Sequence, residues 1–201
     1  MGRPARHAEA AILESARRLS AEVGPQKLTI TAVAARAGAP VGSIYHRYAS
    51  RDEILAAVWL ALVEGFQKQF LAELEGDDPL EAGLNAVRFT CRWVRRHPSD
   101  ARLMLVHRRE DFAAERWPQS YRRRAQALAA GAQESLQRYA SRLLGRGRSL
   151  ELRRVRFALV DLPAAALKRD IEAGVATSKG VEALLLDTCA YALGRARERV
   201  K

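Results

Sequence analysis

The stretch from Leu28 to Glu53 constrains the fold most, because it has the pattern of two short helices separated by a glycine-containing turn. Thr29 is placed to cap the first helix, and Gly38 stands where the end of a helix often requires a positive φ. Pro40 cannot continue the first helix but fits the first turn of the second, where its missing N–H is not needed. The stretch therefore predicts a helix-turn-helix unit.

Both helices of this unit have an apolar face. In the first helix the apolar residues recur at spacings of three and four, and they are Ile30, Val33, Ala34 and Ala37. In the second helix we expect Val41, Ile44 and Tyr48 to face inward. The outer face then holds Gly42, Ser43, Tyr45, His46 and Arg47. Small, polar, aromatic and basic residues on one exposed face suit a helix that enters the major groove of DNA.

This stretch resembles the DNA-binding signature of the TetR family of one-component repressors. The matching residues are Thr29-Ile30, Val33-Ala34, Ala37-Gly38, Gly42 to Tyr45, Tyr48 and Ser50 to Leu55. Two positions depart from the family pattern, which usually has Ser or Thr where Pro40 stands and Lys where Arg51 stands. The resemblance covers about the first quarter of the chain. It implies a three-helix DNA-binding domain followed by a larger helical ligand-binding and dimerisation domain.

The rest of the chain shows helical periodicity without the alternation typical of strands, which predicts an all-α protein. We expect a DNA-binding domain over residues 1–50 and a second domain over residues 51–201. A capping box formed by Ser50 and Glu53 predicts the start of a long helix at the boundary. Because its start touches the predicted DNA reader and its remainder enters the second domain, this helix is a plausible lever.

The chain has 34 Lys and Arg against 23 Asp and Glu, a net charge of +11 that favours polyanionic partners. Residues 1–7, with Arg3 and Arg6, are expected to form a flexible basic arm. The largest excess, eleven arginines against four acids, lies in residues 101–150, outside the predicted DNA reader. An arginine tract within it is either a solvated face or an attractor for an anionic effector such as a fatty acyl thioester. The tract comprises Arg102, Arg108, Arg109, Arg116, Arg122, Arg123 and Arg124.

The predicted partner is double-stranded DNA with a palindromic operator. By chemistry and by the resemblance, the predicted DNA contacts are Thr29, Thr31, Gly42, Ser43, Tyr45, His46, Arg47 and Arg51. Thr29, Thr31 and Arg51 stand at helix starts, where free N–H groups and the helix dipole favour a phosphate.

The second domain is expected to bind an unidentified small-molecule effector between apolar walls with a few polar tips. The predicted ligand residues are Trp59, Phe66, Phe89, Trp93, His107, Trp117 and Tyr121. For each residue taken alone, an ordinary place in the core is the alternative.

The resemblance also implies that the last two helices, roughly residues 150–173 and 178–198, form a four-helix bundle with a second copy of the chain. Their apolar stripes predict the dimer interface, and Pro163 predicts a kink. The predicted interface residues are Leu152, Val155, Leu159, Pro163, Leu167, Val181, Leu184, Leu185, Thr188 and Ala192.

We expect no enzyme activity, because no catalytic motif is present. The four histidines share no metal-ligand spacing, so neither a metal nor a cofactor is expected. Cys91 and Cys189 are expected to be buried as small hydrophobic residues. Without a signal peptide or an uninterrupted apolar run of about 20 residues, we expect a cytoplasmic protein that does not span a membrane.

The leading hypothesis is a homodimeric, sequence-specific repressor that a small-molecule effector releases from its operator. The high net charge motivates a second hypothesis, a ligand-independent architectural DNA-binding protein. A third is a carrier of an apolar ligand that has lost its DNA-reading function.

Overall fold

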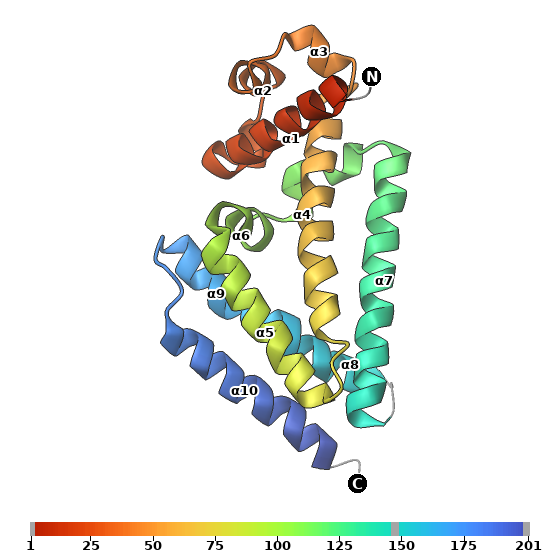
Figure 1. The fold of residues 1–201 in the computed structure, drawn as a ribbon, viewed down its shortest axis with the longest axis vertical. Coiled ribbons are helices and arrows are strands. Elements are labelled where there is room, and N and C mark those ends of the chain that lie inside the picture. Colours follow the sequence, from red (N-terminus) through yellow and green to blue (C-terminus); the bar gives the residue numbers. More distant parts are fainter. Residues whose placement is uncertain (1–2, 146–148, 199–201) are drawn as a thin grey trace.

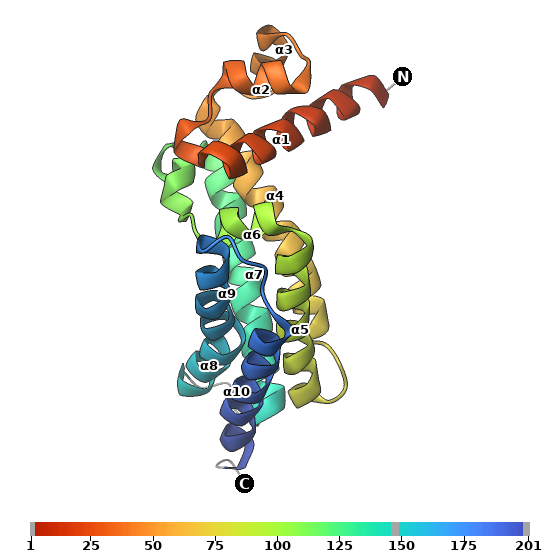
Figure 2. The same ribbon diagram turned by 90° about the vertical axis from the view of Figure 1, so that its left-hand side faces the viewer.

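Helix α4 (Arg51–Glu73) runs through the middle of the molecule and links the unit formed by α1–α3 to the remaining helices (Figure 1). The computed structural model describes residues 3–145 and 149–198, with side chains described for residues 9–145 and 149–194. α7 lies beside α4, and α10 lies along α5 at the opposite end from α1–α3 (Figures 1 and 2). The described residues contain helices and no strand, which confirms the predicted all-α class.

The described helices include the two of the predicted helix-turn-helix unit, the predicted long helix from residue 51 and the predicted C-terminal pair, which lie close to their expected bounds. They are α1 (Arg3–Val23), the 3-10 turn η1 (Pro25–Lys27), α2 (Ile30–Ala37), α3 (Val41–Tyr45), α4 (Arg51–Glu73), α5 (Pro79–Arg96), α6 (Pro98–Leu105), the 3-10 turns η2 (Arg109–Phe112) and η3 (Ala114–Arg116), α7 (Gln119–Leu144), α8 (Ser149–Arg156), the π-helical turn η4 (Phe157–Asp161), α9 (Leu162–Glu172) and α10 (Lys179–Glu198). Residues 3–7 are helical, so a flexible arm over them is a wrong prediction. The side chains of Arg3 and Arg6 lie outside the described residues.

Local signals start and end the long helices where the sequence predicts. Ser50 Oγ accepts a hydrogen bond from the Glu53 N–H at 3.2 Å, and Glu53 Oε2 accepts one from the Ala49 N–H at 2.6 Å. The first bond satisfies an N–H group that the start of α4 would leave unpaired. The second differs from the predicted capping box, because Glu53 binds the N–H of Ala49 and not that of the N-cap residue Ser50. Asp78 caps the start of α5 in the same way. Gly145 ends α7 with a φ of 70°, which a glycine adopts without strain.

The helix predicted over residues 150–173 is continuous but not uniformly α-helical. At η4 the Leu162 N–H donates to the Phe157 carbonyl, five residues earlier. Pro163 has no N–H, and in an α-helix its ring would crowd the carbonyl of Leu159. A wider π turn just before the proline relieves this crowding.

Two hydrophobic cores share α4 and α7. The N-terminal core joins α1–α3 and the first part of α4 to residues between Leu103 and Ala125. The C-terminal core joins the end of α4 to α5, the end of α7 and α8–α10. The predicted domain division at residue 50 stays a prediction. The hydrophobic packing itself changes part-way along α4, between Leu62 and Phe70, so the helix-turn-helix unit shares its core with the segment that follows α6.

By length and composition alone, α4 could cross a membrane, and it is the one helix in the described part of the chain that meets this criterion. Core helices of water-soluble proteins meet the criterion as well. Seven α4 side chains are buried against the rest of the chain, as in a core helix.

Candidate nucleic-acid interface

Helix α2 forms the first half of the predicted helix-turn-helix motif. The Thr29 hydroxyl accepts a hydrogen bond from the Ala32 N–H at 3.2 Å and so caps the helix as predicted. Val33 is fully buried in the N-terminal core. Gly38 ends the helix in the left-handed conformation, with a φ of 62°. Thr31 is exposed in the first turn, where the N–H groups of α2 lack intrahelical partners.

Helix α3 is held by two buried residues that the sequence predicts. Ile44 is fully buried and Tyr48 is 4% exposed. Pro40 stands at the N-cap, just before the first helical residue. The inward orientation predicted for Val41 is wrong, because its side chain is 40% exposed. Side chains tilt toward the N-terminus of a helix, so that of the first residue leans past the helix start.

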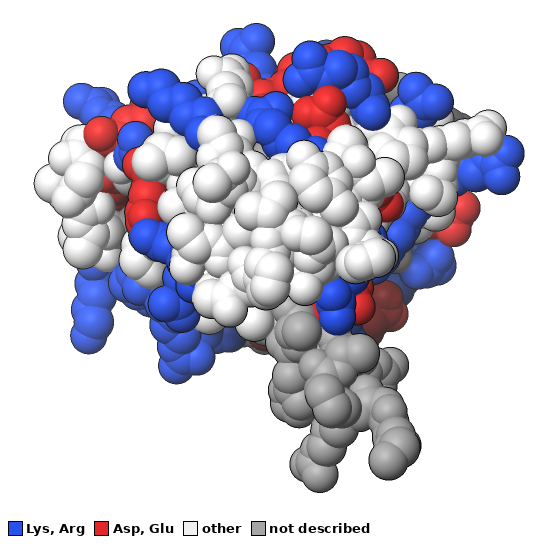
Figure 3. All heavy atoms as spheres, turned by 90° about the horizontal axis from the view of Figure 1, so that it is seen from above, with Lys and Arg blue, Asp and Glu red and all other residues white. Residues whose placement is uncertain are grey.

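The predicted DNA-reading face of α3 is open to solvent. Gly42 and His46 are exposed, Ser43 is half-buried, and Tyr45 is 53% exposed. A Cβ atom on Gly42 would meet no atom within 4 Å, so the fold itself does not require a glycine there. Seen from this end, uncharged residues cover the centre of the surface, and Lys and Arg lie around it with Asp and Glu among them (Figure 3). An uncharged centre suits contacts to base edges, and the Lys and Arg side chains around it suit contacts to phosphates.

Two arginines of the motif differ in how freely they could meet DNA. Arg47 donates from Nη1 to the Ser43 carbonyl at 2.9 Å, and its other N–H groups have no partner among the described residues. Arg36 binds both carboxylate oxygens of Glu22, at 2.5 and 2.7 Å. This hydrogen-bonded pairing holds the pKa of the Glu22 carboxyl below its ordinary value. Arg47 therefore remains the better candidate for a phosphate contact.

Arg51 is a correction to the predicted contacts. Its Nε donates to the Leu28 carbonyl at 2.6 Å, and its Nη2 donates to the carbonyls of Pro25 at 2.8 Å and Gln26 at 2.6 Å. Nη1 donates to Asp52 Oδ1 at 3.1 Å. Because four of its five N–H groups are used within the chain, the predicted phosphate contact does not fit this structure.

The predicted ligand residues form two aromatic groups in separate cores. Trp59, Trp117 and Tyr121 belong to the N-terminal core, Phe66, Phe89 and Trp93 belong to the C-terminal core, and His107 lies against Gly24. The Trp59 and Trp117 rings are 5.3 Å apart between centroids, and the Phe66 and Trp93 rings are 5.0 Å apart. Burial, together with Glu53, raises the pKa of the Tyr121 hydroxyl. The ligand role of these residues stays a prediction.

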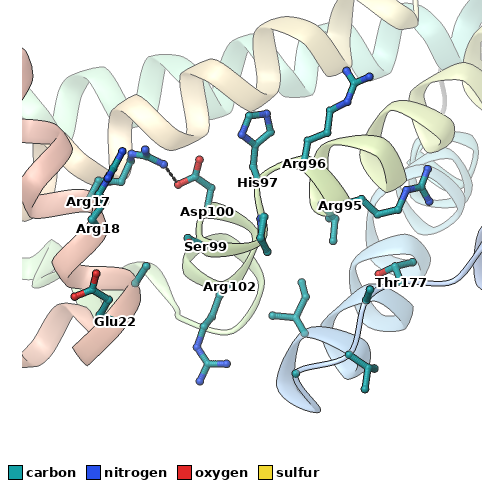
Figure 4. A pocket seen from close by; sticks show the side chains of 17 residues that line it. Arg17, Arg18, Glu22, Arg95, Arg96, His97, Ser99, Asp100, Arg102 and Thr177 are labelled. Atoms are coloured by element: carbon teal, nitrogen blue, oxygen red, sulfur yellow. Dashed lines mark hydrogen bonds and ion pairs between the residues drawn. The ribbon is translucent and has the colours of Figure 1, made fainter.

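A cavity of about 880 Å³ lies between α1, the junction of α5 and α6, and the connection from α9 to α10 (Figure 4). Its charged lining residues are Arg17, Arg18, Glu22, Arg95, Arg96, Asp100 and Arg102. Arg17 pairs with Asp100 across the interface between α1 and α6. The hydroxyl of Thr177 is buried there and has no hydrogen-bond partner among the described residues. None of the seven predicted ligand residues lines this cavity, because it joins three segments that are distant in the sequence.

The predicted dimer residues divide between the inside and the outside of the chain. Those buried within the chain are Val155, Leu159, Pro163, Leu167 and Leu185, which contradicts an interface role for them. Leu184 and Thr188 are exposed, and Leu152, Val181 and Ala192 are half-buried. The sequence prediction missed the exposed apolar residues Leu150, Phe157 and Tyr191. The stronger apolar stripe of each helix serves its own core, and a weaker outer stripe is exposed on the single chain.

No group of three or more His, Cys, Asp or Glu side chains in the described part of the chain is arranged to hold a metal ion. Cys91 and Cys189 are buried as predicted, and burial raises the pKa of each thiol to about 11. Such thiols are poor nucleophiles and poor metal ligands.

Residues 12–58 match the family model described as "Bacterial regulatory proteins, tetR family". No curated protein matches the chain significantly. A TetR family transcription regulator from Marinobacter aquaeolei VT8 superposes with a TM-score of 0.72 at 17% identity, covering 96% of this chain and 98% of that chain. FadR from Bacillus subtilis, solved with stearoyl-CoA, gives 0.70 at 14% identity, covering 92% and 97%. PfmR from Thermus thermophilus gives 0.68 at 21% identity, covering 91% and 97%.

These findings confirm the resemblance on which the DNA-binding motif was interpreted. The family match covers the end of α1, the whole helix-turn-helix and the start of α4. The structural likeness extends over nearly the whole chain and shows its fold. Residues 12–58 therefore match the model of the tetR family of bacterial regulatory proteins, and the chain as a whole has the fold of solved TetR-family transcription regulators.

Proposed function

We propose that the protein is a homodimeric, sequence-specific repressor that binds a palindromic operator in the cytoplasm. The outer face of α3 carries the proposal. Tyr45 and His46 are exposed beside Gly42, and the packing around residue 42 leaves room for a side chain, so it does not explain the glycine. The buried side chains of Ile44 and Tyr48 hold the helix on its inner side. A rigid helix with small and hydrogen-bonding outer residues suits the reading of base edges in the major groove.

A second copy of the chain completes the proposed reader. Large apolar side chains are exposed on α8, the π turn η4 and α10, which contact one another in the fold. These side chains are Leu150, Phe157, Leu184 and Tyr191. A two-fold pairing of this surface would bury it and place two α3 helices on half-sites one helical turn apart, or a multiple of it.

We further propose that an anionic small molecule releases the repressor. FadR from Bacillus subtilis has this fold and was solved with stearoyl-CoA. Arg96 at the end of α5 and Arg102 in α6 line the cavity of the present chain and have no pairing partner among the described residues. Since α4 contributes to both cores, a ligand that shifted it would change the separation of the two α3 helices.

The architectural DNA-binding alternative rests on the net charge of +11. It requires equal affinity for unrelated duplexes and a steep dependence on salt. The uncharged centre of the α3 surface favours the sequence-specific function instead.

The double substitution Ser43→Ala with Tyr45→Ala tests the proposal. We expect it to lower affinity for a duplex selected from random sequences by at least about 100-fold, because both half-sites lose base contacts. Dimerisation and the unfolding midpoint should stay unchanged, since Tyr45 is largely exposed. Ser120→Ala, an exposed serine on α7, is the matched control. Unchanged duplex affinity in the double variant would refute the assignment of the reading face.

A further inference from the structure

The short turn η1, which joins α1 to α2, is held by the guanidinium of Arg51 from the start of α4. Three successive bonds reach the carbonyls of Pro25, Gln26 and Leu28, at 2.8, 2.6 and 2.6 Å. The end of a helical turn leaves carbonyls without intrahelical partners and carries a partial negative charge. A planar fork with five donors can satisfy several such carbonyls at once, whereas a lysine ammonium acts as a compact point charge.

The same turn is also bound by the segment that follows α6. Gln26 Nε2 donates to Asp111 Oδ1 at 2.7 Å, while Asp111 Oδ2 accepts from the Arg108 N–H at 2.8 Å. His107 lies against Gly24, whose φ of 88° favours glycine. The turn is therefore contacted from one side by α4 and from another by residues 107–111.

A second connection runs through the neighbour of Arg51. Asp52 accepts from Arg51 and pairs with Arg116 of η3 at 2.8 Å. Arg51 thus links the turn η1 to the Asp52 carboxylate of α4, and the same carboxylate pairs with Arg116 of η3. Removing the Arg51 guanidinium would therefore release both the turn η1 and the Asp52 carboxylate from it.

The segment that makes these contacts contains a strained residue. Ala113, between η2 and η3, has a φ of 59° and is the one non-glycine residue with a positive φ in the described part of the chain. It is 4% exposed and packed in the N-terminal core. An L-residue adopts this conformation at a cost, and such residues cluster at sites that switch between arrangements.

We propose that Arg51 is a positioning residue for DNA reading, which sets the orientation of α2 and α3 by fixing η1 to α4. Residues 107–116 contact the same assembly, through Asp111 at Gln26 of the turn and through Arg116 at Asp52 beside Arg51. The inference rests on the proposed function. It explains why arginine stands where the TetR family pattern usually has lysine, because a guanidinium can bind three carbonyls and the Asp52 carboxylate at once, whereas a lysine ammonium has only three N–H donors. It also gives the contacts through which a rearrangement of residues 107–116 would shift η1, and with it α2 and α3.

Arg51→Lys tests the proposal, because it keeps the charge and removes the fork. With a duplex selected from random sequences, we expect affinity to fall at least about tenfold while the slope of log affinity against log salt stays unchanged. Arg92→Lys, an exposed arginine of α5 paired with Glu73, is the matched control and should change neither quantity. Retained affinity in Arg51→Lys, or a reduced salt slope in Arg51→Met, would show a direct phosphate contact and overturn the proposal.

Two further measurements keep the inference testable by itself. Arg116→Ala removes a 60%-exposed side chain, so it should fold, and its effect on affinity should be non-additive with that of Arg51→Lys. Hydrogen exchange in Arg51→Lys should accelerate at the amides of η1 and α2 and stay unchanged in α10. If random duplexes yield no specific site, the proposed function fails, whereas the exchange result still decides the role of Arg51. Unchanged exchange at η1 and α2 would refute that role.

Discussion

Adjacent leucines on α10 separate the proposed dimer surface from the protomer core. Leu184 is 67% exposed and Leu185 is 3% exposed, so the same substitution has different consequences at the two positions. Fully burying a leucine contributes about 1.5–3 kcal/mol, and two-thirds of this leaves about 1–2 kcal/mol for Leu184 to gain from a partner. A two-fold interface counts each substitution twice, so Leu184→Ala should weaken the dimer by about 2–4 kcal/mol, or roughly 30- to 1,000-fold.

Leu185→Ala should instead lower the free energy of unfolding by about 2–5 kcal/mol, because it leaves a cavity in the C-terminal core. Sedimentation equilibrium gives the dimer constant of each variant, and urea unfolding at a concentration where the chain is monomeric gives the stability of the protomer. An unchanged dimer constant in Leu184→Ala would refute the outward-facing interface. Dissociation of Leu185→Ala into stable monomers would instead support the interface role that the sequence predicted for Leu185.

Two further predictions concern stability. Gly83→Ala should destabilise the protein by about 2–4 kcal/mol in urea unfolding, because the new Cβ would overlap the hydroxyl of Tyr139, which is 2% exposed. Gly131→Ala, where nothing lies within 4 Å, should instead stabilise α7 by about 0.5–1 kcal/mol, and equal effects at the two glycines would contradict the packing described. Burial raises the pKa of the Cys91 and Cys189 thiols from 9.0 to about 11. Between these two pH values the unfolded chain releases the thiol protons while the folded chain keeps them, so the free energy of unfolding should fall as the pH rises from 9.0 toward 11. Replacing both cysteines by alanine should flatten this part of the pH profile.

Local signals in the sequence predicted local structure well. The cap at Thr29, the left-handed Gly38 and the Ser50 cap of α4 occur as expected, whereas Glu53 binds the Ala49 N–H and not the Ser50 N–H of the predicted capping box. Each depends on hydrogen bonds between residues a few positions apart, or on the steric freedom of one glycine. The inner positions Ile44 and Tyr48 were predictable for a similar reason, since helical spacing fixes which residues share a face.

Contacts between distant segments were not predictable in the same way. Arg51 was expected to meet a phosphate, whereas its fork binds carbonyls more than 20 residues away. The aromatic residues expected to line one pocket are divided between two cores, because periodicity does not say which partner an apolar face meets. Five of the ten residues predicted for the dimer interface are buried in their own chain for the same reason: the strongest apolar stripe of a terminal helix faces its own core.

Selection of bound duplexes from a random library, at near-physiological salt and with sequencing of the retained pool, tests the central claim most directly. We expect a palindrome whose half-sites lie about one helical turn apart, since two α3 helices related by a two-fold axis read the same sequence twice. Loss of this enrichment in the Ser43→Ala, Tyr45→Ala variant would assign the reading to α3. A pool without any preferred sequence, retained in a strongly salt-dependent manner, would contradict a sequence-specific repressor and favour the architectural function.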